Sequence, residues 1–253
     1  MGKNQAIEEA EAMDEFAGLG LVDEVLGMIK TGKEANVYLC SGGSRAPAPL
    51  LAAKVYRSTK VRQFADSAAY TPGRREEWHR AGMKRREMRA MEKRSRGGRE
   101  LSFALWVSAE YETLRLLHRA GADVPAPYAK TQRAVLMQYF GDADTPAPPL
   151  VDVELAGEEA HALFARALEN IELLLANDRV HGDLSAYNIL YVDGGVRLID
   201  FPQAIDARFN PNAQPFLERD IVNVCHYFAR YIDTGDAGAI ARRLWTRFLR
   251  GEL

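Results

Sequence analysis

Short apolar runs bounded by turn-forming residues mark the first 140 residues of the chain. Runs at 25–29 and 37–39 flank the turn "KTGKEAN" and predict a pair of strands, the second of which ends at the Gly/Pro-rich stretch "SGGSRAPAP". A third strand is predicted at 50–58. A Pro-rich link, a short strand and an apolar strand at 134–140 follow later. The pattern therefore predicts five strands before residue 141.

Helical spacing takes over in two parts of the chain. Leu105, Ala109, Leu114 and Leu117 recur at near-helical intervals, and Gly121 is suited to end that helix. After the linker "GDADTPAPPL", further helices are predicted near 157–177, 213–231 and 236–250. Between them, "VDGGV" separates two strand-like runs and predicts a β-hairpin turn.

This order of elements predicts an α+β chain in two lobes. We expect residues 1–20 to form a tail or helix, and residues 21–140 to form a five-stranded antiparallel sheet plus one helix. Residues 141–253 are expected to be mainly helical with one small hairpin. Clefts between domains are common sites for small ligands, so the linker between the lobes directs attention there.

Composition excludes several classes of protein. The 253 residues carry a formal net charge of -2, so the chain as a whole is not a polyelectrolyte binder. Its two cysteines, Cys40 and Cys225, have neither the spacing of a metal site nor that of a disulfide framework. The polar, acidic N-terminus does not resemble a signal peptide, and no apolar run is long enough to span a bilayer. We expect a cytoplasmic protein without membrane contact.

Residues 58–100 differ from the rest in charge, with 13 Lys or Arg against 6 Asp or Glu. They show little apolar periodicity until their end. One interpretation is a solvated, mobile insertion. The other is a basic arm that contacts an acidic partner such as RNA or nucleotide phosphate. The two interpretations are compatible.

Five polar residues in unusual positions carry the candidate chemistry. Lys54 stands alone in the apolar run "LLAAKVYRS", where a charge needs a partner, and Glu110 is the candidate because it lies mid-helix among apolar positions. In "RVHGDLSAYNILYVDGGVRLIDF", the hairpin brings Asn188 and Asp200 to its open end, where their oxygens suit a hard divalent cation. Asp183, in the preceding loop, is placed to orient a hydroxyl and take up its proton.

These segments resemble the protein-kinase-like superfamily, and within it the RIO family of atypical serine/threonine protein kinases. The resemblance rests on "TGKEANVY", "AAKVYR", "WVSAEYETLRLLHRAGADVPAPYA", "VLMQYFGDADTPAPPLVDVEL", "HGDLSAYN" and "IDFPQAID", and it covers roughly residues 20–232. The chain is most similar to compact members of this family that have no winged-helix module. It implies a two-lobed kinase-like fold and phosphoryl transfer from ATP with Mg²⁺ (or Mn²⁺).

The resemblance also implies roles for individual residues. Asp183 would be the catalytic base, Asn188 and Asp200 would bind the metal, and a phosphorylated Asp200 is a further family-based possibility. Lys54 would contact the phosphates and pair with Glu110. The remaining contacts would be made to the phosphates by Lys33 within the turn 31–35, and to adenine at the hinge by Met137, Gln138 and Phe140.

The same resemblance implies a protein substrate, and an RNA or ribosomal partner is a further expectation. The substrate would be an unidentified protein or the chain itself, with Ser58, Ser67 and Ser95 as candidate autophosphorylation sites. Contact with RNA or a ribosomal subunit would run through 58–100.

Three features depart from ordinary protein kinases. Phe201-Pro202 follows the metal-binding Asp where most have Phe-Gly, no Ala-Pro-Glu follows, and only about 50 residues remain after Asp200. We therefore expect the activation segment and the usual peptide-binding helices to be missing, which puts peptide recognition in doubt.

Two other functions compete with the kinase interpretation. Aminoglycoside and choline kinases share "HGD", a nearby Asn and "IDF", so a small-molecule phosphotransferase is the main alternative. A non-catalytic module that uses nucleotide as a switch or docks on RNA is the second. His181 and Asp220 are expected to hold the loop in place rather than to act on substrate.

Overall fold

The computed structural model describes residues 3–57, 89, 91, 93 and 95–253. Ser58, Ser67 and most of the predicted basic arm (58–100) lie outside the described residues. The chain forms two compact units, each described here by itself. Of the described residues, the first unit holds those up to Glu112 together with 126–146, and the second holds 113–125 and 147–253. The lobe boundaries expected from the sequence stay a prediction.

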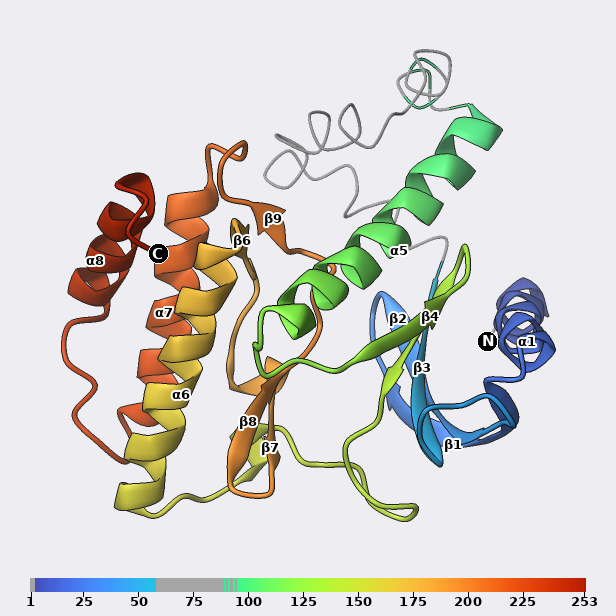
Figure 1. Cartoon of the computed structure of the whole chain (residues 1–253), viewed down its shortest axis with the longest axis horizontal. Coiled ribbons are helices and arrows are strands. Elements are labelled where there is room, and N and C mark those ends of the chain that lie inside the picture. The colour runs from blue at the N-terminus through green and yellow to red at the C-terminus, as the bar shows by residue number, and fades with distance from the viewer. Residues whose placement is uncertain (1–2, 58–88, 90, 92, 94) are drawn as a thin grey trace. The chain divides into compact units, whose positions relative to one another are not determined.

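A five-stranded antiparallel sheet forms the centre of the first unit (Figure 1). Its order is β1-β2-β3-β5-β4, so β1 and β4 are the edge strands and β3 is central. The predicted α+β class with five antiparallel strands is confirmed. The strands are β1 (Val22–Thr31), β2 (Ala35–Gly42), β3 (Leu50–Tyr56), β4 (Pro127–Lys130) and β5 (Ala134–Gln138).

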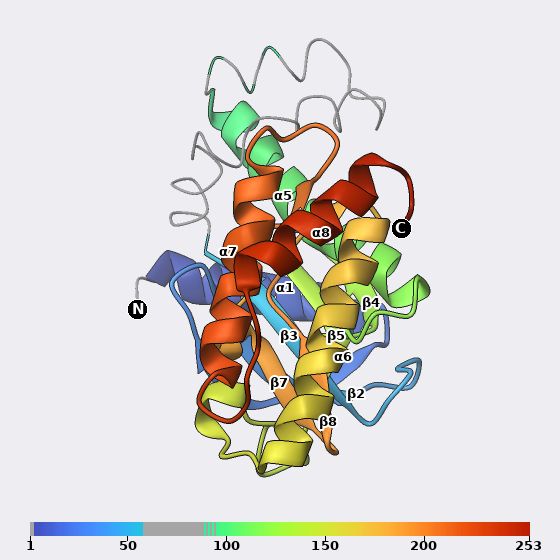
Figure 2. The ribbon, with the colours of Figure 1, turned by 90° about the vertical axis from the view of Figure 1, so that its left-hand side faces the viewer.

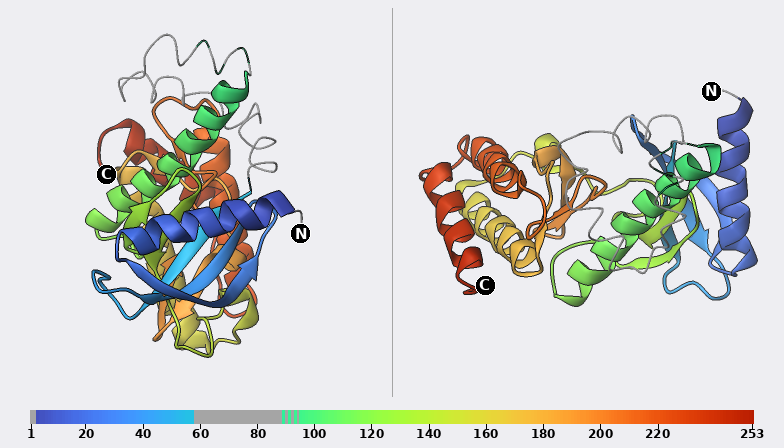
Figure 3. Two further views of the ribbon diagram at one scale, coloured as in Figure 1. Left: turned by 90° about the vertical axis from the view of Figure 1, so that its right-hand side faces the viewer. Right: turned by 90° about the horizontal axis from the view of Figure 1, so that it is seen from above.

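Helices cover the two faces of this sheet (Figure 3). Helix α1 (Lys3–Gly18) packs Phe16 into a core with Leu51, Val55 and Leu136, all of which are buried. On the other face lies α5 (Arg96–Arg119), whose Trp106 ring meets Tyr56 edge-on at a centroid distance of 4.9 Å. Burying aromatic and branched side chains on both faces supplies the main free energy of folding of the unit.

Helix α5 begins earlier than the apolar spacing predicts. Its first turn is capped by Ser95, whose Oγ accepts a hydrogen bond from the Gly98 N–H at 3.1 Å. The helix ends as predicted before Gly121, which has φ 83° and follows the pattern of a left-handed C-terminal cap. Gly121 thus turns the chain toward the loop that holds Asp123.

Three long helices pack together in the second unit (Figure 2). They are α6 (Gly157–Ala176), α7 (Ala213–Phe228) and α8 (Ala237–Leu249). α6 buries a helical stripe that includes Leu163, Ile171 and Leu174, and Asp236 caps α8 by accepting from the Ala239 N–H at 3.1 Å. None of the helices formed by the described residues combines the length and apolarity needed to cross a membrane.

Short strands and turns connect these helices. Strands β6 (Arg179–Val180) and β9 (Ile205–Asp206) pair with each other, and β7 (Ile189–Val192) pairs with β8 (Gly195–Leu198) to form the predicted hairpin. At its tip Asp193 and Gly194 have φ 49° and 76°, the left-handed values that a type I′ turn needs. Single turns of 3-10 helix, η1 (Leu150–Asp152) and η2 (Ala186–Asn188), complete the unit.

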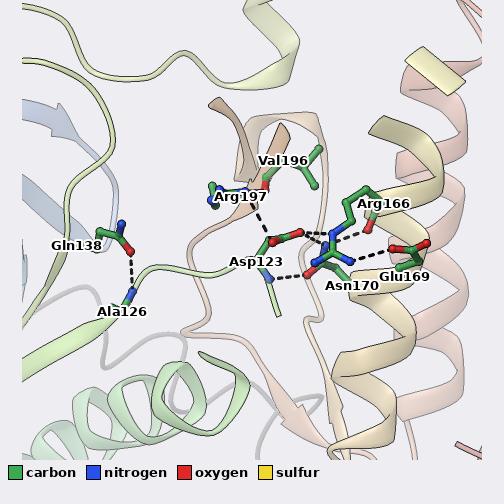
Figure 4. A network of polar contacts seen from close by, with 8 residues as sticks. All are labelled: Asp123, Ala126, Gln138, Arg166, Glu169, Asn170, Val196 and Arg197. Carbon is green, nitrogen blue, oxygen red and sulfur yellow. Dashed lines mark hydrogen bonds and ion pairs between the residues drawn. The ribbon is translucent and has the colours of Figure 1, made fainter. Parts of the chain in front are cut away.

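Asp123 ties the loop after α5 to the rest of this unit (Figure 4). Its carboxylate accepts from Arg166 Nε at 2.5 Å and from Asn170 Nδ2 at 2.8 Å, and lies 3.7 Å from Arg197 Nη1. Its main-chain oxygen accepts from the Leu198 N–H at 2.7 Å, which fixes the end of β8 two residues before Asp200. Burial works against ionisation, but Arg166 and Asn170 outweigh it and lower the pKa of Asp123.

We predict that Asp123→Ala lowers the free energy of unfolding by about 2 kcal/mol at pH 7, because the buried Asn170 Nδ2 loses one of its two acceptors and Arg166 loses its carboxylate partner. Since the folded-state pKa of Asp123 is depressed, this contribution is present above the unfolded-state pKa and is lost as pH falls through the folded-state value. Urea unfolding of both proteins at pH 7 and near pH 3 measures the difference.

Glu252→Gln is the control, because the Arg250–Glu252 pair lies at the surface with side chains 67% and 50% exposed. Solvent screening makes such pairs contribute little. An equal loss in both variants, or a loss for Asp123→Ala that does not shrink at low pH, contradicts this account of the Asp123 contacts.

Candidate active site

Lys54 and Glu110 form a buried ion pair in the first unit. Lys54 Nζ lies 2.7 Å from Glu110 Oε1, and the two residues are 8% and 2% exposed. Lys54 comes from the central strand β3 and Glu110 from α5, which covers that face of the sheet. The ammonium also lies 5.1 Å from the centre of the Tyr56 ring, a cation–π distance. The pair holds a positive charge at a fixed place on the sheet.

The turn between β1 and β2 holds Lys33. The Gly32 N–H donates to the Ala35 carbonyl at 2.9 Å, and the Glu34 carbonyl accepts from the Arg57 N–H at 2.8 Å. Lys33 itself is exposed. The residue that follows the turn, Asn36, is fully buried and is held by side-chain bonds to Glu9, Tyr38 and Arg57. The turn is thus anchored at both ends.

The predicted hinge comprises the last two residues of strand β5 and the residues just after it. Met137 is buried, and the Gln138 N–H donates to the Ala126 carbonyl at 2.8 Å. The Gln138 side chain returns the contact by accepting from the Ala126 N–H at 3.3 Å (Figure 4). The N–H of Gln138 is therefore engaged within the protein. Phe140 lies two residues further on, just after the end of the strand.

Asp183 lies in the second unit, in the loop that leaves strand β6. The residue is exposed, whereas Gly182 and Leu184 on either side of it are buried. From α7, Asp220 accepts hydrogen bonds from the N–H groups of Gly182 at 2.8 Å and Leu184 at 2.9 Å. Asp220 therefore holds the loop's main chain, as its place in the sequence predicts, and Asp183 points out from the held segment.

The segments that carry Asn188 and Asp200 lie side by side at the open end of the hairpin. The Ile199 N–H donates to the Asn188 carbonyl at 2.9 Å, and Asn188 Nδ2 donates to the Asp183 carbonyl at 2.9 Å. Asp200 has φ 72°, a left-handed conformation that is uncommon for a residue other than glycine and often marks functional sites. The segments that carry Asp183, Asn188 and Asp200 are thus joined directly by hydrogen bonds.

His181 links the same segments. Its Nε2 lies 3.1 Å from the Ile199 carbonyl, and its Nδ1 lies 3.4 Å from the Asp183 N–H. A carbonyl can only accept and an N–H can only donate, so these contacts fit the neutral ring protonated on Nε2. The ring also packs against Phe201 at a centroid distance of 4.6 Å. His181 is buried and acts here as a bridge between two main-chain segments.

Charge and burial act together on the carboxyl groups. Desolvation raises the pKa of Asp183, the positive charge of Arg219 opposes that rise, and the nearby negative charge of Asp200 adds to it. Burial also raises the pKa of Asp220 to about 7, although its two N–H partners and Arg219 favour the ionised form. The negative charges of Asp183 and Asp200 repel each other, and a cation bound beside them would relieve that repulsion.

Sequence reasoning missed two residues that contact the Asp183 loop. Arg219 donates to the Gly182 carbonyl, and Asn223 Nδ2 donates to the Leu184 carbonyl at 3.0 Å. Their positions in the sequence could have indicated this contact. Arg219 lies one residue before Asp220 and Asn223 three residues after it in "ERDIVNV", on the same side of a helix.

We predict that Lys54→Met lowers the free energy of unfolding by about 3 kcal/mol, because the Glu110 carboxylate is left buried without its cation. The double variant Lys54→Met/Glu110→Leu should recover most of this loss, since both charges are gone. Urea denaturation of the parent, the single variant and the double variant measures the loss of stability and its recovery. A double variant less stable than the single one would contradict the importance of the buried pair.

Comparison with known proteins assigns the family. The family model for the RIO domain matches residues 36–237. The human "Serine/threonine-protein kinase RIO1" is 32% identical over 216 residues, which cover 84% of this chain and 34% of the relative. The "RIO-type serine/threonine-protein kinase Rio1" of Haloferax volcanii is 33% identical over 213 residues, 83% of this chain and 65% of the relative.

A third relative matches a shorter part. The Thermoplasma acidophilum "RIO-type serine/threonine-protein kinase Rio1" is 37% identical over 127 residues, 50% of this chain and 65% of the relative. The chain thus spans about a third of the human relative and just under two thirds of the archaeal ones. Since the RIO model covers well over half of its residues, the chain belongs to the RIO family.

Proposed function

We propose that the chain is an ATP- and Mg²⁺-dependent serine/threonine protein kinase or ATPase of the RIO type. The observation that carries the proposal is the hydrogen-bonded assembly of the segments bearing Asp183, Asn188 and Asp200. The buried Lys54–Glu110 pair adds support, because it supplies the fixed positive charge that phosphate binding needs. The names of the curated relatives, all serine/threonine-protein kinases, point the same way.

Each residue has a defined task in this reaction. Asp183 accepts a hydrogen bond from the substrate hydroxyl and takes its proton as the oxygen attacks the γ-phosphorus. The bond from that phosphorus to the bridging oxygen breaks, and ADP leaves with the charge. Lys54 binds phosphate oxygens while Glu110 keeps its ammonium in place. Lys33, exposed on its turn, is an additional phosphate contact.

The donor set fits a hard divalent cation. Asn188 and Asp200 offer one amide and one carboxylate oxygen, and Mg²⁺ typically takes one or two protein carboxylates together with phosphate oxygens and water. Among the described residues, no group of three His, Cys, Asp or Glu side chains is placed to hold a metal. Nucleotide phosphates would supply further oxygen ligands beside the Asn188 amide and the Asp200 carboxylate. The cation, Mg²⁺ or the similarly coordinated Mn²⁺, would neutralise charge on the phosphates.

Adenine would be bound at the hinge. Because the Gln138 N–H is already donated to Ala126, we assign the carbonyl oxygen of Gln138 as its contact with the base. Phe140 would supply a main-chain N–H, and Met137 would pack behind the ring.

The protein substrate stays unidentified. Autophosphorylation, contact of residues 58–100 with RNA or a ribosomal subunit, and a cytoplasmic location stay predictions.

We predict that Asp200→Asn lowers Mg²⁺-dependent ATP turnover and autophosphorylation by about a hundredfold or more, because metal-assisted charge stabilisation is worth several kcal/mol. Asn tolerates the left-handed conformation of this position, so the backbone is preserved. The measurement is steady-state ATP hydrolysis and phosphate incorporation with purified protein.

Asp193→Asn is the matched control. It makes the same chemical change at another left-handed Asp, at the tip of the same hairpin, and should leave turnover within twofold of the parent. Parent and Asp200→Asn turning over ATP equally would contradict the proposal. If an aminoglycoside or choline raises ATP consumption many-fold while no protein is phosphorylated, the small-molecule phosphotransferase replaces the protein kinase.

A further inference from the structure

The three residues centred on Asp183 have an unusual main chain. Each N–H and each carbonyl of Gly182, Asp183 and Leu184 has a hydrogen-bond partner in a side chain. Strands and helices normally satisfy such groups through other main-chain groups. The shape of this loop is therefore set by side chains supplied from elsewhere in the second unit.

Helix α7 supplies four of these six contacts. Asp220 accepts from the N–H groups of Gly182 and Leu184, while Arg219 donates to the Gly182 carbonyl and Asn223 to the Leu184 carbonyl. Residues 219, 220 and 223 lie on one side of the helix, because a helix brings positions three and four apart next to each other. The same helix thus holds both polar groups of the residue before Asp183 and both of the residue after it.

Arg219 and Asn223 bind main-chain carbonyls, which the Asp220 carboxylate cannot do. A carboxylate only accepts, so it fixes N–H groups and leaves carbonyls free to tilt. With both the N–H and the carbonyl of Leu184 held, the two peptide planes that meet at Leu184 have defined orientations. Gly182, at φ 80°, adopts a conformation that only glycine takes easily, so the plane before Asp183 depends on its contacts as well.

We propose that Arg219 and Asn223 are positioning residues for Asp183, which orient its carboxylate by holding the carbonyls of Gly182 and Leu184. The proposal rests on the proposed function, in which Asp183 is the base. It assigns to α7 a set of donors that complements Asp220. A base displaced by a fraction of an ångström loses much of its rate advantage, so loss of one donor should act on the chemical step.

Asn223 gives the cleaner test of the two. Arg219 carries a charge that acts on Asp183 directly, so replacing it changes two properties at once. Asn223→Leu keeps the approximate shape, adds no charge and removes the donor. Asn177→Leu is the matched control, because Asn177 is also half-buried and donates from Nδ2 to a main-chain carbonyl, that of Leu173, at 2.8 Å at the end of α6.

The experiment measures kcat and KM for ATP of the full chain, with the folded fraction determined by circular dichroism at the assay temperature. We expect Asn223→Leu to lower kcat about ten- to hundredfold while KM for ATP stays within twofold. Asn177→Leu should keep kcat within twofold. A purely structural role would lower the unfolding midpoint of both variants and leave kcat per folded molecule unchanged.

The outcomes separate the two levels of the proposal. If the parent turns over ATP and Asn223→Leu matches it in kcat, the positioning role is overturned and the proposed function stands. If the parent shows no Mg²⁺-dependent turnover, the proposed function falls and the positioning role falls with it. Should Asn223→Leu not fold, Asn223→Ala is assayed in the same way and the same results decide.

Discussion

The buried carboxylate of Asp220 is the interaction on which the candidate site depends. It accepts hydrogen bonds from the N–H groups of Gly182 and Leu184, so the chain between strand β6 and the turn η2 follows one path. That path makes Asp183 point outward and leaves its carbonyl where Asn188 can donate to it. A buried acid is costly, and burial raises its pKa to about 7, but two N–H donors compensate for part of that cost.

The two halves of the proposed chemistry are built by different means. In the first unit, a sheet and the helix packed on it bring Lys54 and Glu110 together, and desolvation makes the pair hard to separate. In the second unit, the strands are short, and the main chain around the candidate site is held mostly by hydrogen bonds from side chains. His181, Asn188 and the residues of α7 each connect segments that a hairpin with four-residue strands and a pair of two-residue strands could not hold alone.

Much of this could be predicted from the sequence, for definable reasons. A lone Lys in an apolar strand requires a partner, and "VDGGV" requires a tight turn, so local rules lead to Lys54 and to the hairpin. Asn223, Arg219 and the Asp123 contacts could not be predicted in the same way. Their partners are main-chain atoms and side chains far away in sequence, and an Asn or Arg on a helix ordinarily faces solvent.

The most direct test of the account is calorimetric titration of the full chain with a non-hydrolysable ATP analogue, with Mg²⁺ and with excess EDTA. The account predicts binding that strengthens at least about tenfold with Mg²⁺ in the parent, and no such gain in Asp200→Asn, since Asp200 would help to hold the cation that neutralises phosphate charge. Affinity that is the same with Mg²⁺ and with EDTA, or no binding under either condition, would contradict it.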